Sequence, residues 1–482
     1  MHDNLSTLDA TAQAALVRRG EASPLELVDA AITRIERLNP QLNAVITRLF
    51  DKARAQARSG NAPDGPFRGV PFLLKDIGAH SGGDPFHAGM RVLRDSRWTE
   101  PDDTYLAAKY RAAGFVFLGK TNTPELGLLP TTEPAAYGPT RNPWDPSRSP
   151  GGSSGGAAAA VASGMVPAAH ATDGGGSIRI PASHCGLVGL KTSRGRISIG
   201  PDASERWGGF AVENSVTRSV RDTAAILDAI AGYVPGDPYT APVPARPFCA
   251  EVGADPGGLR IGLLTNAPSG IPVAPECVAA ADAAAKLLAS LGHRVEASHP
   301  AALSDPEMTR AFGTVLACAT ARALDAWGEK IGTTITRDGV ESMTWAFAEF
   351  GRQASARDYL RAVQFVQSHT RRIVGWWTQG FDLLLTPTTA EPPPLLGSFE
   401  SPPDNPLAGL FRAAPFSTFT APFNMTGQPA ISLPLYWSDA GLPIGAQLVA
   451  AYGREDVLIR VASQLEQAQP WRQRLPRVHA AV

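Results

Sequence analysis

The chain has 482 residues, of which 44% are hydrophobic and 18% are charged, and this composition is ordinary for a soluble globular enzyme with a substantial core. Its formal net charge of −1 excludes an overall field that would attract nucleic acid or an anionic membrane. The four cysteines form no C-x-x-C motif and the nine histidines form no close cluster, so neither a disulfide framework nor a metal site is expected.

The N-terminal segment has acidic residues early and no apolar run, so we expect no signal peptide and a cytoplasmic location. Ser23 to Glu26 predict a capping box with proline in the first helical position. The apolar spacing that follows predicts a helix that ends at Asn39–Pro40. Further strands are predicted at 42–49, 70–74, 115–118 and 259–264, and further helices at 51–59, 105–113, 275–291 and 455–465. This alternation predicts an α/β sheet with helices on both faces.

Two glycine-rich turns with serines lie close together in residues 148–179. The first is GGSSGG, with Ser153 and Ser154, and the second is DGGGS, with Ser177. A phosphate-binding loop is excluded because no G-K-[ST] follows the glycines. The first turn fits the G-x-S-x-G pattern of a nucleophile elbow, but its lead-in is rich in proline and cannot be a central strand. No histidine has a context that would make it the partner of either turn.

A flexible loop before a small-faced helix at 157–162 is the simplest interpretation of the first turn, but it leaves the second turn unexplained. Residues 166–172 predict a short strand, so Ser177 lies where a strand gives way to a turn. Three successive glycines can present their N–H groups to one point, which an oxyanion requires. Each such donor lowers a barrier by about 2.7–4 kcal/mol.

A neutral lysine can replace histidine as the activating base, since burial lowers the pKa of an ammonium group. Four of the seven lysines are expected on solvated helices: Lys52, Lys109, Lys286 and Lys330. The other three end short apolar segments: Lys75, Lys120 and Lys191. A strand-end lysine that reaches solvent or a carboxylate is the simpler alternative for each of them. The pattern alone leaves the choice among the three open.

The chain resembles the amidase signature family of serine amidohydrolases. The resemblance depends on GGSSGG at 151–156, TDGGGSIRIPA at 172–182, GVPFLLKD at 69–76, GKTNTPE at 119–125 and PFNMTGQPAISLP at 422–434. It covers essentially the whole chain and implies a large twisted mixed β-sheet flanked by helices on both faces, in one amidase domain over residues 1–482. It also implies that no metal or cofactor is needed.

Carried over to this sequence, the resemblance implies a Ser–cisSer–Lys triad of Ser177 as nucleophile, Ser153 as bridging serine in a cis peptide, and Lys75 as base. The oxyanion donors that it implies are the N–H groups of Gly174, Gly175, Gly176 and Ser177. The residues expected to support them are Ser154, Asp173 and Arg179. One departure concerns Gly174, because the family often has an aliphatic residue there.

The expected activity is hydrolysis of small, fairly apolar amides through an acyl-enzyme. Cyclic amides, aryl amides, esters and urethanes are all candidate substrates. The alternatives are a glutaminase subunit of a tRNA-dependent amidotransferase and an inactive binding protein, the latter disfavoured because every triad position is filled. The resemblance also implies that Cys318 matches a cysteine that lines the substrate pocket of a family member. The simpler interpretation is a buried small residue on a helix at 311–327. The expected partner is a small amide substrate, and neither nucleic acid nor a membrane is expected to bind. The sequence leaves open whether the protein forms a homodimer.

Overall fold

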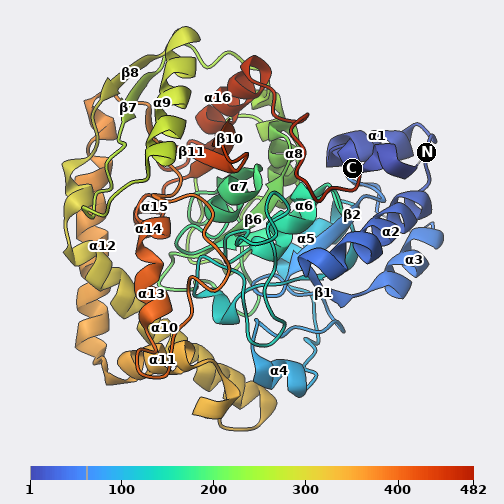
Figure 1. Ribbon diagram of the computed structural model, residues 1–482, viewed down its shortest axis with the longest axis horizontal. Helices are drawn as coiled ribbons and strands as arrows, with labels where there is room; N and C mark the ends of the chain where they lie inside the picture. Colours follow the sequence, from blue (N-terminus) through green and yellow to red (C-terminus); the bar gives the residue numbers. More distant parts are fainter. Residues whose placement is uncertain (1, 61–62) are drawn as a thin grey trace.

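The computed structural model describes residues 2–60 and 63–482, and the strands within these residues form one mixed sheet of eleven strands. Their order is β1-β3-β2-β4-β6-β5-β10-β11-β9-β7-β8. The strands are β1 (Val45–Arg48), β2 (Pro71–Lys75), β3 (Val116–Thr121), β4 (Ala168–Asp173), β5 (Val188–Lys191), β6 (Val212–Thr217), β7 (Arg260–Leu263), β8 (Arg294–Ala297), β9 (Leu383–Pro387), β10 (Ala430–Trp437) and β11 (Pro443–Ala450). Helices pack on both faces of this sheet, which confirms the predicted fold class (Figure 1).

Three core clusters account for most of the helices. One face of the sheet packs against α5 (Tyr105–Ala112), α8 (Val220–Ile230) and α16 (Glu455–Ala468). The other face packs against α2 (Pro24–Leu42), α3 (Phe50–Arg58) and α6 (Gly155–Ala162). A third cluster contains α10 (Glu307–Ile331), α11 (Ser342–Gln353) and α12 (Ala356–Val374). In Figure 1 these last helices lie on the opposite side of the molecule from α1 (Ala10–Arg18), α2 and α3.

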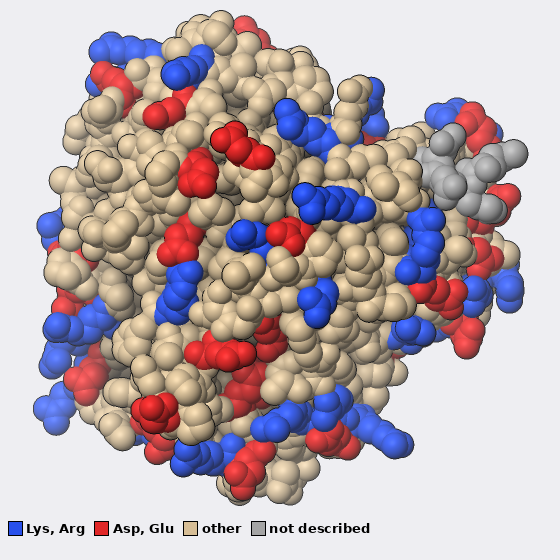
Figure 2. Space-filling model, in the orientation of Figure 1, with Lys and Arg blue, Asp and Glu red and all other residues tan. Residues whose placement is uncertain are grey.

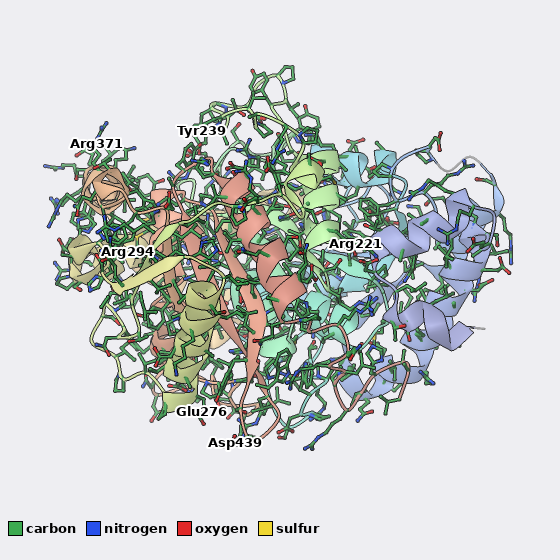
Figure 3. The ribbon with its side chains drawn as sticks, turned by 90° about the horizontal axis from the view of Figure 1, so that it is seen from above. Arg221, Tyr239, Glu276, Arg294, Arg371 and Asp439 are labelled. Atoms are coloured by element: carbon green, nitrogen blue, oxygen red, sulfur yellow. The ribbon has the colours of Figure 1, made fainter. Side chains whose placement is uncertain are left out.

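The helix α9 (Pro275–Ser290) packs on β9, β10 and β11. The remaining helices are short: α4 (Arg91–Asp95), α7 (Arg179–Cys185), α13 (Ala408–Arg412), α14 (Ala414–Ser417) and α15 (Ala421–Thr426). Figure 3 shows the molecule turned by 90° about the horizontal axis, with Arg371 of α12 and Arg221 of α8 well apart in this view.

The candidate site is built where β2, β3 and β4 run parallel. β2 lies between the other two, with Phe72 opposite Phe117 on one side and Ala168 on the other. All residues of β2 are buried, as expected of a parallel strand covered on both faces. Because β2 and β4 are parallel, their carboxyl ends, at Lys75 and Asp173, lie at the same edge of the sheet.

The helix α2 begins with the predicted capping box but ends later than predicted. Pro40 lies in its last turn, and the helix continues to Leu42. A proline there forfeits one intrahelical hydrogen bond, but the last turn still closes, since the N–H of Asn43 donates to the carbonyl oxygen of Asn39 at 2.7 Å. Beyond the helix, the Asn39 Oδ1 atom accepts the N–H groups of Ala44 and Val45 at 2.8 and 2.7 Å. The predicted end at Asn39–Pro40 is therefore wrong, because one missing N–H donor does not stop the helix from completing its last turn.

The surface shown in Figure 2 carries interspersed basic and acidic side chains, in keeping with the net charge of −1. In the described part of the chain, no helix has the length and apolarity that a membrane crossing requires. Over the same residues, no three histidine, cysteine, aspartate or glutamate side chains are grouped so that they could hold a metal ion.

Candidate active site

Lys75 ends the buried strand β2, and its ammonium group meets a serine of the first glycine-rich turn. The Nζ atom donates to Ser153 Oγ at 2.6 Å and to Thr172 Oγ1, on β4, at 2.8 Å. The side chain has no exposed surface. Burial lowers the pKa of Lys75 to about 7, although the carboxylates of Glu213 and Asp173 oppose this shift. A substantial fraction of Lys75 is therefore neutral near neutral pH and can accept a proton.

Ser153 lies at the end of a turn that packs against neighbouring backbone. The Gly152–Ser153 peptide bond is cis, as the resemblance implied. A Cβ atom on Gly152 would lie 2.3 Å from the carbonyl oxygen of Thr131, so only glycine fits there. The next residue, Ser154, accepts the N–H of Thr172 at 3.2 Å through its Oγ atom. The first turn is thus fixed against β4, the strand that carries the second turn.

Asp173 organises the second turn through its carboxylate. It accepts the N–H groups of Gly176 at 2.7 Å and Ile178 at 3.1 Å, and it pairs with Arg179 at 2.9 Å. Both members of the ion pair are fully buried. Burial alone would raise the pKa of Asp173, but Arg179 lowers it to about 2. The expected support of the turn by Asp173 and Arg179 agrees with these contacts.

The N–H groups of the second turn are not all available to a ligand. That of Gly176 is bound to Asp173. Within the described residues, those of Gly174, Gly175 and Ser177 donate to no protein acceptor. Thr420 donates to the carbonyl oxygen of Gly175 at 2.6 Å, which fixes the orientation of that peptide. Three donors therefore remain for an oxyanion, one fewer than expected from the sequence.

Ser177 is partly exposed and opens into a small cavity of about 60 Å³ that Ser153, Thr172 and Gly174 also line. A larger cavity of about 570 Å³ adjoins it, since the two have several lining residues in common. The residues lining both are Ile77, Gly78, Leu126, Arg206 and Trp207. We call the first the inner chamber and the second the vestibule.

The other two strand-end lysines are as buried as Lys75 but lie away from the serines. The Nζ atom of Lys120 is 5.8 Å from the centre of the Phe86 ring, and that of Lys191 donates to the carbonyl oxygen of Thr192 at 2.9 Å. Burial lowers the pKa of Lys120 to about 8 and also lowers the pKa of Lys191 well below its ordinary value. Burial therefore does not distinguish the three lysines, whereas position does.

Sequence reasoning missed a chain of polar contacts behind Lys75. The backbone N–H of Lys75 donates to His170 Nδ1 at 3.3 Å, and His170 Nε2 lies 3.0 Å from a carboxylate oxygen of Glu213. Because Nδ1 accepts, the neutral ring carries its proton on Nε2 and donates it to Glu213. Arg206 pairs with the other oxygen of Glu213. His170 and Thr172 alternate on β4 and could have been found as polar residues on one face of a buried strand; the pairing with β6 could not.

Cys318 lies on α10, where that helix packs on α11. Its Sγ atom is 3.8 Å from the carbonyl oxygen of Gly351, and it lines neither the inner chamber nor the vestibule. The simpler interpretation, a buried small residue on this helix, agrees only in part, since Cys318 lies in the helix contact but is half-buried. The neighbouring Ala319 and Thr320 line the vestibule instead.

Known proteins resemble this chain over nearly its whole length. The Amidase family profile matches residues 26–459. The chain is 46% identical to the 6-aminohexanoate-cyclic-dimer hydrolase of Paenarthrobacter ureafaciens over 478 residues, which cover 98% of this chain and 96% of that protein. The crystal structure of a 6-aminohexanoate cyclic dimer hydrolase complexed with substrate matches with a TM-score of 0.95 and 46% identity, over 98% of this chain and 99% of that one. A glutamyl-tRNA(Gln) amidotransferase subunit from Thermotoga maritima matches with a TM-score of 0.77 and 26% identity, over 99% of this chain and 98% of that one.

Proposed function

Because the chain belongs to the amidase family and is an amide-cleaving enzyme, we propose that it hydrolyses small, fairly apolar amides through a triad of Ser177, Ser153 and Lys75. The observation that carries this proposal is the 2.6 Å hydrogen bond between Lys75 Nζ and Ser153 Oγ beside the chamber into which Ser177 opens. We further propose that residues 1–482 form a single amidase domain, because one continuous sheet draws its strands from both halves of the chain.

In the acylation step, neutral Lys75 takes the proton of Ser153 while Ser153 takes that of Ser177. The Ser177 oxygen attacks the amide carbonyl, and the N–H groups of Gly174, Gly175 and Ser177 stabilise the oxyanion. Gly176 acts differently, since its N–H is held by Asp173 and shapes the turn. The protonated Lys75 then returns a proton through Ser153 to the leaving nitrogen, and the C–N bond breaks.

In the deacylation step, water attacks the ester that joins the acyl group to Ser177. Its proton passes to Lys75 through Ser153, and the same donors hold the second oxyanion. Collapse of this intermediate releases the carboxylic acid and returns a proton to Ser177. The residues that act therefore return to their starting protonation states after one turnover.

The substrate is proposed to be apolar because aromatic side chains line the vestibule. Phe86, Trp207 and Trp327 all contribute to it. The hydrolase from Paenarthrobacter ureafaciens, 46% identical over nearly the whole chain, is named for a cyclic dimer of 6-aminohexanoate. We therefore include cyclic amides among the candidate substrates, together with aryl amides, esters and urethanes. The alternative of a tRNA-dependent amidotransferase component has weaker support, since identity to such a protein is 26%.

The proposal is tested by measuring ammonia or amine release from simple linear and aryl amides with the purified protein alone. We expect Ser177→Ala and Lys75→Ala to lose nearly all turnover, because each removes a group that bonds or moves a proton in both steps. Ser154→Ala should keep a measurable fraction, since among the described residues the Ser154 Oγ atom forms hydrogen bonds only with the backbone of β4. If Lys75→Ala stays fully active and Lys120→Ala does not, the base is wrongly assigned. Activity that requires a partner protein would favour the amidotransferase.

A further inference from the structure

The ring of Trp207 occupies the space in which a side chain at position 174 would lie. A Cβ atom built on Gly174 would be 2.5 Å from both Cε3 and Cζ3 of that ring. Real Cβ atoms essentially never approach other heavy atoms within 3.0 Å. Glycine at position 174 therefore lets the indole lie directly on the turn that carries Ser177.

The backbone holds Trp207 in an uncommon conformation. Its φ angle is +55°, in the left-handed region that bulky residues rarely adopt. The next residue is Gly208, and a Cβ atom there would lie 3.1 Å from Val315 of α10. Phe210 stacks on Phe312 with ring centres 5.7 Å apart. These contacts with α10 hold the loop in place. Residues with an uncommon backbone conformation, such as Trp207, concentrate at ligand sites, where the surrounding structure holds them in that conformation.

Trp207 also lines both the inner chamber and the vestibule, and its ring is the largest of the side chains that the two cavities share. The chamber around Ser177 measures about 60 Å³ against about 570 Å³ for the vestibule. One water molecule needs about 10–15 Å³ on this measure, so the chamber has room for only a few heavy atoms. A group that reaches Ser177 from the vestibule must therefore be narrow where the chamber wall, including the indole, encloses it.

We propose that Trp207 is a specificity-determining residue, which admits to Ser177 acyl groups that are unbranched next to the carbonyl and rejects branched ones. The inference rests on the proposed function, because it takes Ser177 as the nucleophile. An unbranched chain can pass the edge of the indole and extend into the vestibule. A branch on the adjacent carbon would have to occupy volume that the ring fills, and the Gly174 turn on the other side of the ring prevents its retreat.

The matched substrates are pentanamide and its isomer 2,2-dimethylpropanamide, which release ammonia and differ only in branching. The measured quantity is the ratio of kcat/KM for the branched amide to that for the linear one. We expect Trp207→Ala to raise this ratio by about tenfold or more, the range in which a pocket discriminates one or two methyl groups. Trp207→Phe, which keeps a smaller ring, should give an intermediate ratio. Trp345→Ala, which removes a partly buried tryptophan on α11 away from the site, should leave the ratio unchanged.

Access to Ser177 can be measured without amide turnover. Methanesulfonyl fluoride and phenylmethanesulfonyl fluoride each form an O–S bond with a serine oxygen and release fluoride, while the serine proton passes to the base. The rates are followed by mass spectrometry, and peptide mapping locates the label. Trp207→Ala should speed labelling by the bulky reagent relative to the small one by about tenfold or more.

A double-substitution cycle tests the contact itself. Gly174→Ala should lower the melting temperature, because the new methyl group overlaps the indole. In Trp207→Ala the same change should cost much less, since the ring is gone. Equal costs in the two backgrounds would overturn the contact on which the inference depends.

The outcomes separate the inference from the proposed function. If sulfonyl fluoride labels a residue other than Ser177, or if Ser177→Ala still hydrolyses pentanamide, the proposed function fails. If Ser177 is labelled and Trp207→Ala and Trp207→Phe both keep the wild-type ratios, the inference alone is overturned. Phenylalanine retains an aromatic ring at position 207, so this variant decides the question if the alanine variant does not fold.

Discussion

At the scale of single residues, the charge of Lys75 depends on the groups that face it. Asp173 and Glu213 are the carboxylates that raise its pKa against the effect of burial. His170 is buried and its pKa is lowered by burial, so the ring is neutral. The buried groups Asp76 and Lys120 act on one another's pKa and are not among the groups that shift the pKa of Lys75. Glu213 is therefore the residue through which the protonation of the base can be changed without touching the nucleophile.

We expect the activity to rise with pH as Lys75 loses its proton, with a midpoint near its pKa of about 7. Glu213→Gln removes a negative charge that favours the ammonium form, so the midpoint should move to lower pH, by about 1 unit. The measurement is kcat/KM against pH for a neutral amide. Glu213→Asp keeps the charge and should keep a midpoint near that of the wild type.

The matched control is Glu455→Gln, which also removes a buried carboxylate from an arginine pair, the one with Arg196. This pair is not among the groups that affect Lys75, so the midpoint should not move. An unchanged midpoint in Glu213→Gln would show that Glu213 does not control the base. A shift to higher pH would contradict the sign of the electrostatic effect.

At the scale of elements, two short segments with no regular structure place the serines. One precedes α6 and holds Ser153, and the other joins β4 to α7 and holds Ser177. The sequence predicted both turns from their glycines, as well as the strand before the second one. It could not predict that the first turn lies against Thr131 or the second against Trp207, because each contact joins segments that are distant in the sequence.

Gly152→Ala tests how tightly the first turn is enclosed. The new methyl group would overlap the backbone of Thr131 at 2.3 Å, so we expect loss of activity together with a lower melting temperature. Gly313→Ala is the matched control, since a Cβ atom at this position in α10 would have no neighbour within 4 Å. Alanine there should stabilise the helix by about 0.5–1 kcal/mol. Wild-type activity in Gly152→Ala would mean that the first turn need not be rigid.

At the scale of the whole molecule, Arg179 connects the site to the far part of the chain. Besides Asp173, its guanidinium donates to the carbonyl of Thr420 at 3.0 Å, to Asn424 Oδ1 at 2.7 Å and to Gln447 Oε1 at 2.7 Å. These partners lie before or on α15 and on β11, about 240 to 270 residues further along the chain. The second turn therefore has its shape only when both halves of the sheet are assembled.

Arg179→Met should lower the free energy of unfolding by about 3–5 kcal/mol, because it leaves the Asp173 carboxylate buried without its partner. Activity should fall as well, since the same carboxylate holds the N–H of Gly176. Denaturant unfolding and amide turnover give the two values. Arg19→Met, which breaks an exposed pair with Glu21, should change neither. If Arg179→Met were inactive but as stable as the wild type, Arg179 would be needed for the active site and not for the stability of the fold.

The sequence by itself determined the α/β class, most of the elements near the site and the two turns, because apolar periodicity and glycine runs are local properties. It also reduced the candidate base to three strand-end lysines, all of which the fold buries. Only the tertiary structure decided among them, since Lys75 alone of the three contacts Ser153. The tertiary structure likewise revealed His170, Glu213 and Trp207 beside the site. Their contacts join strands and loops whose pairing depends on the whole sheet, and no local pattern encodes that pairing.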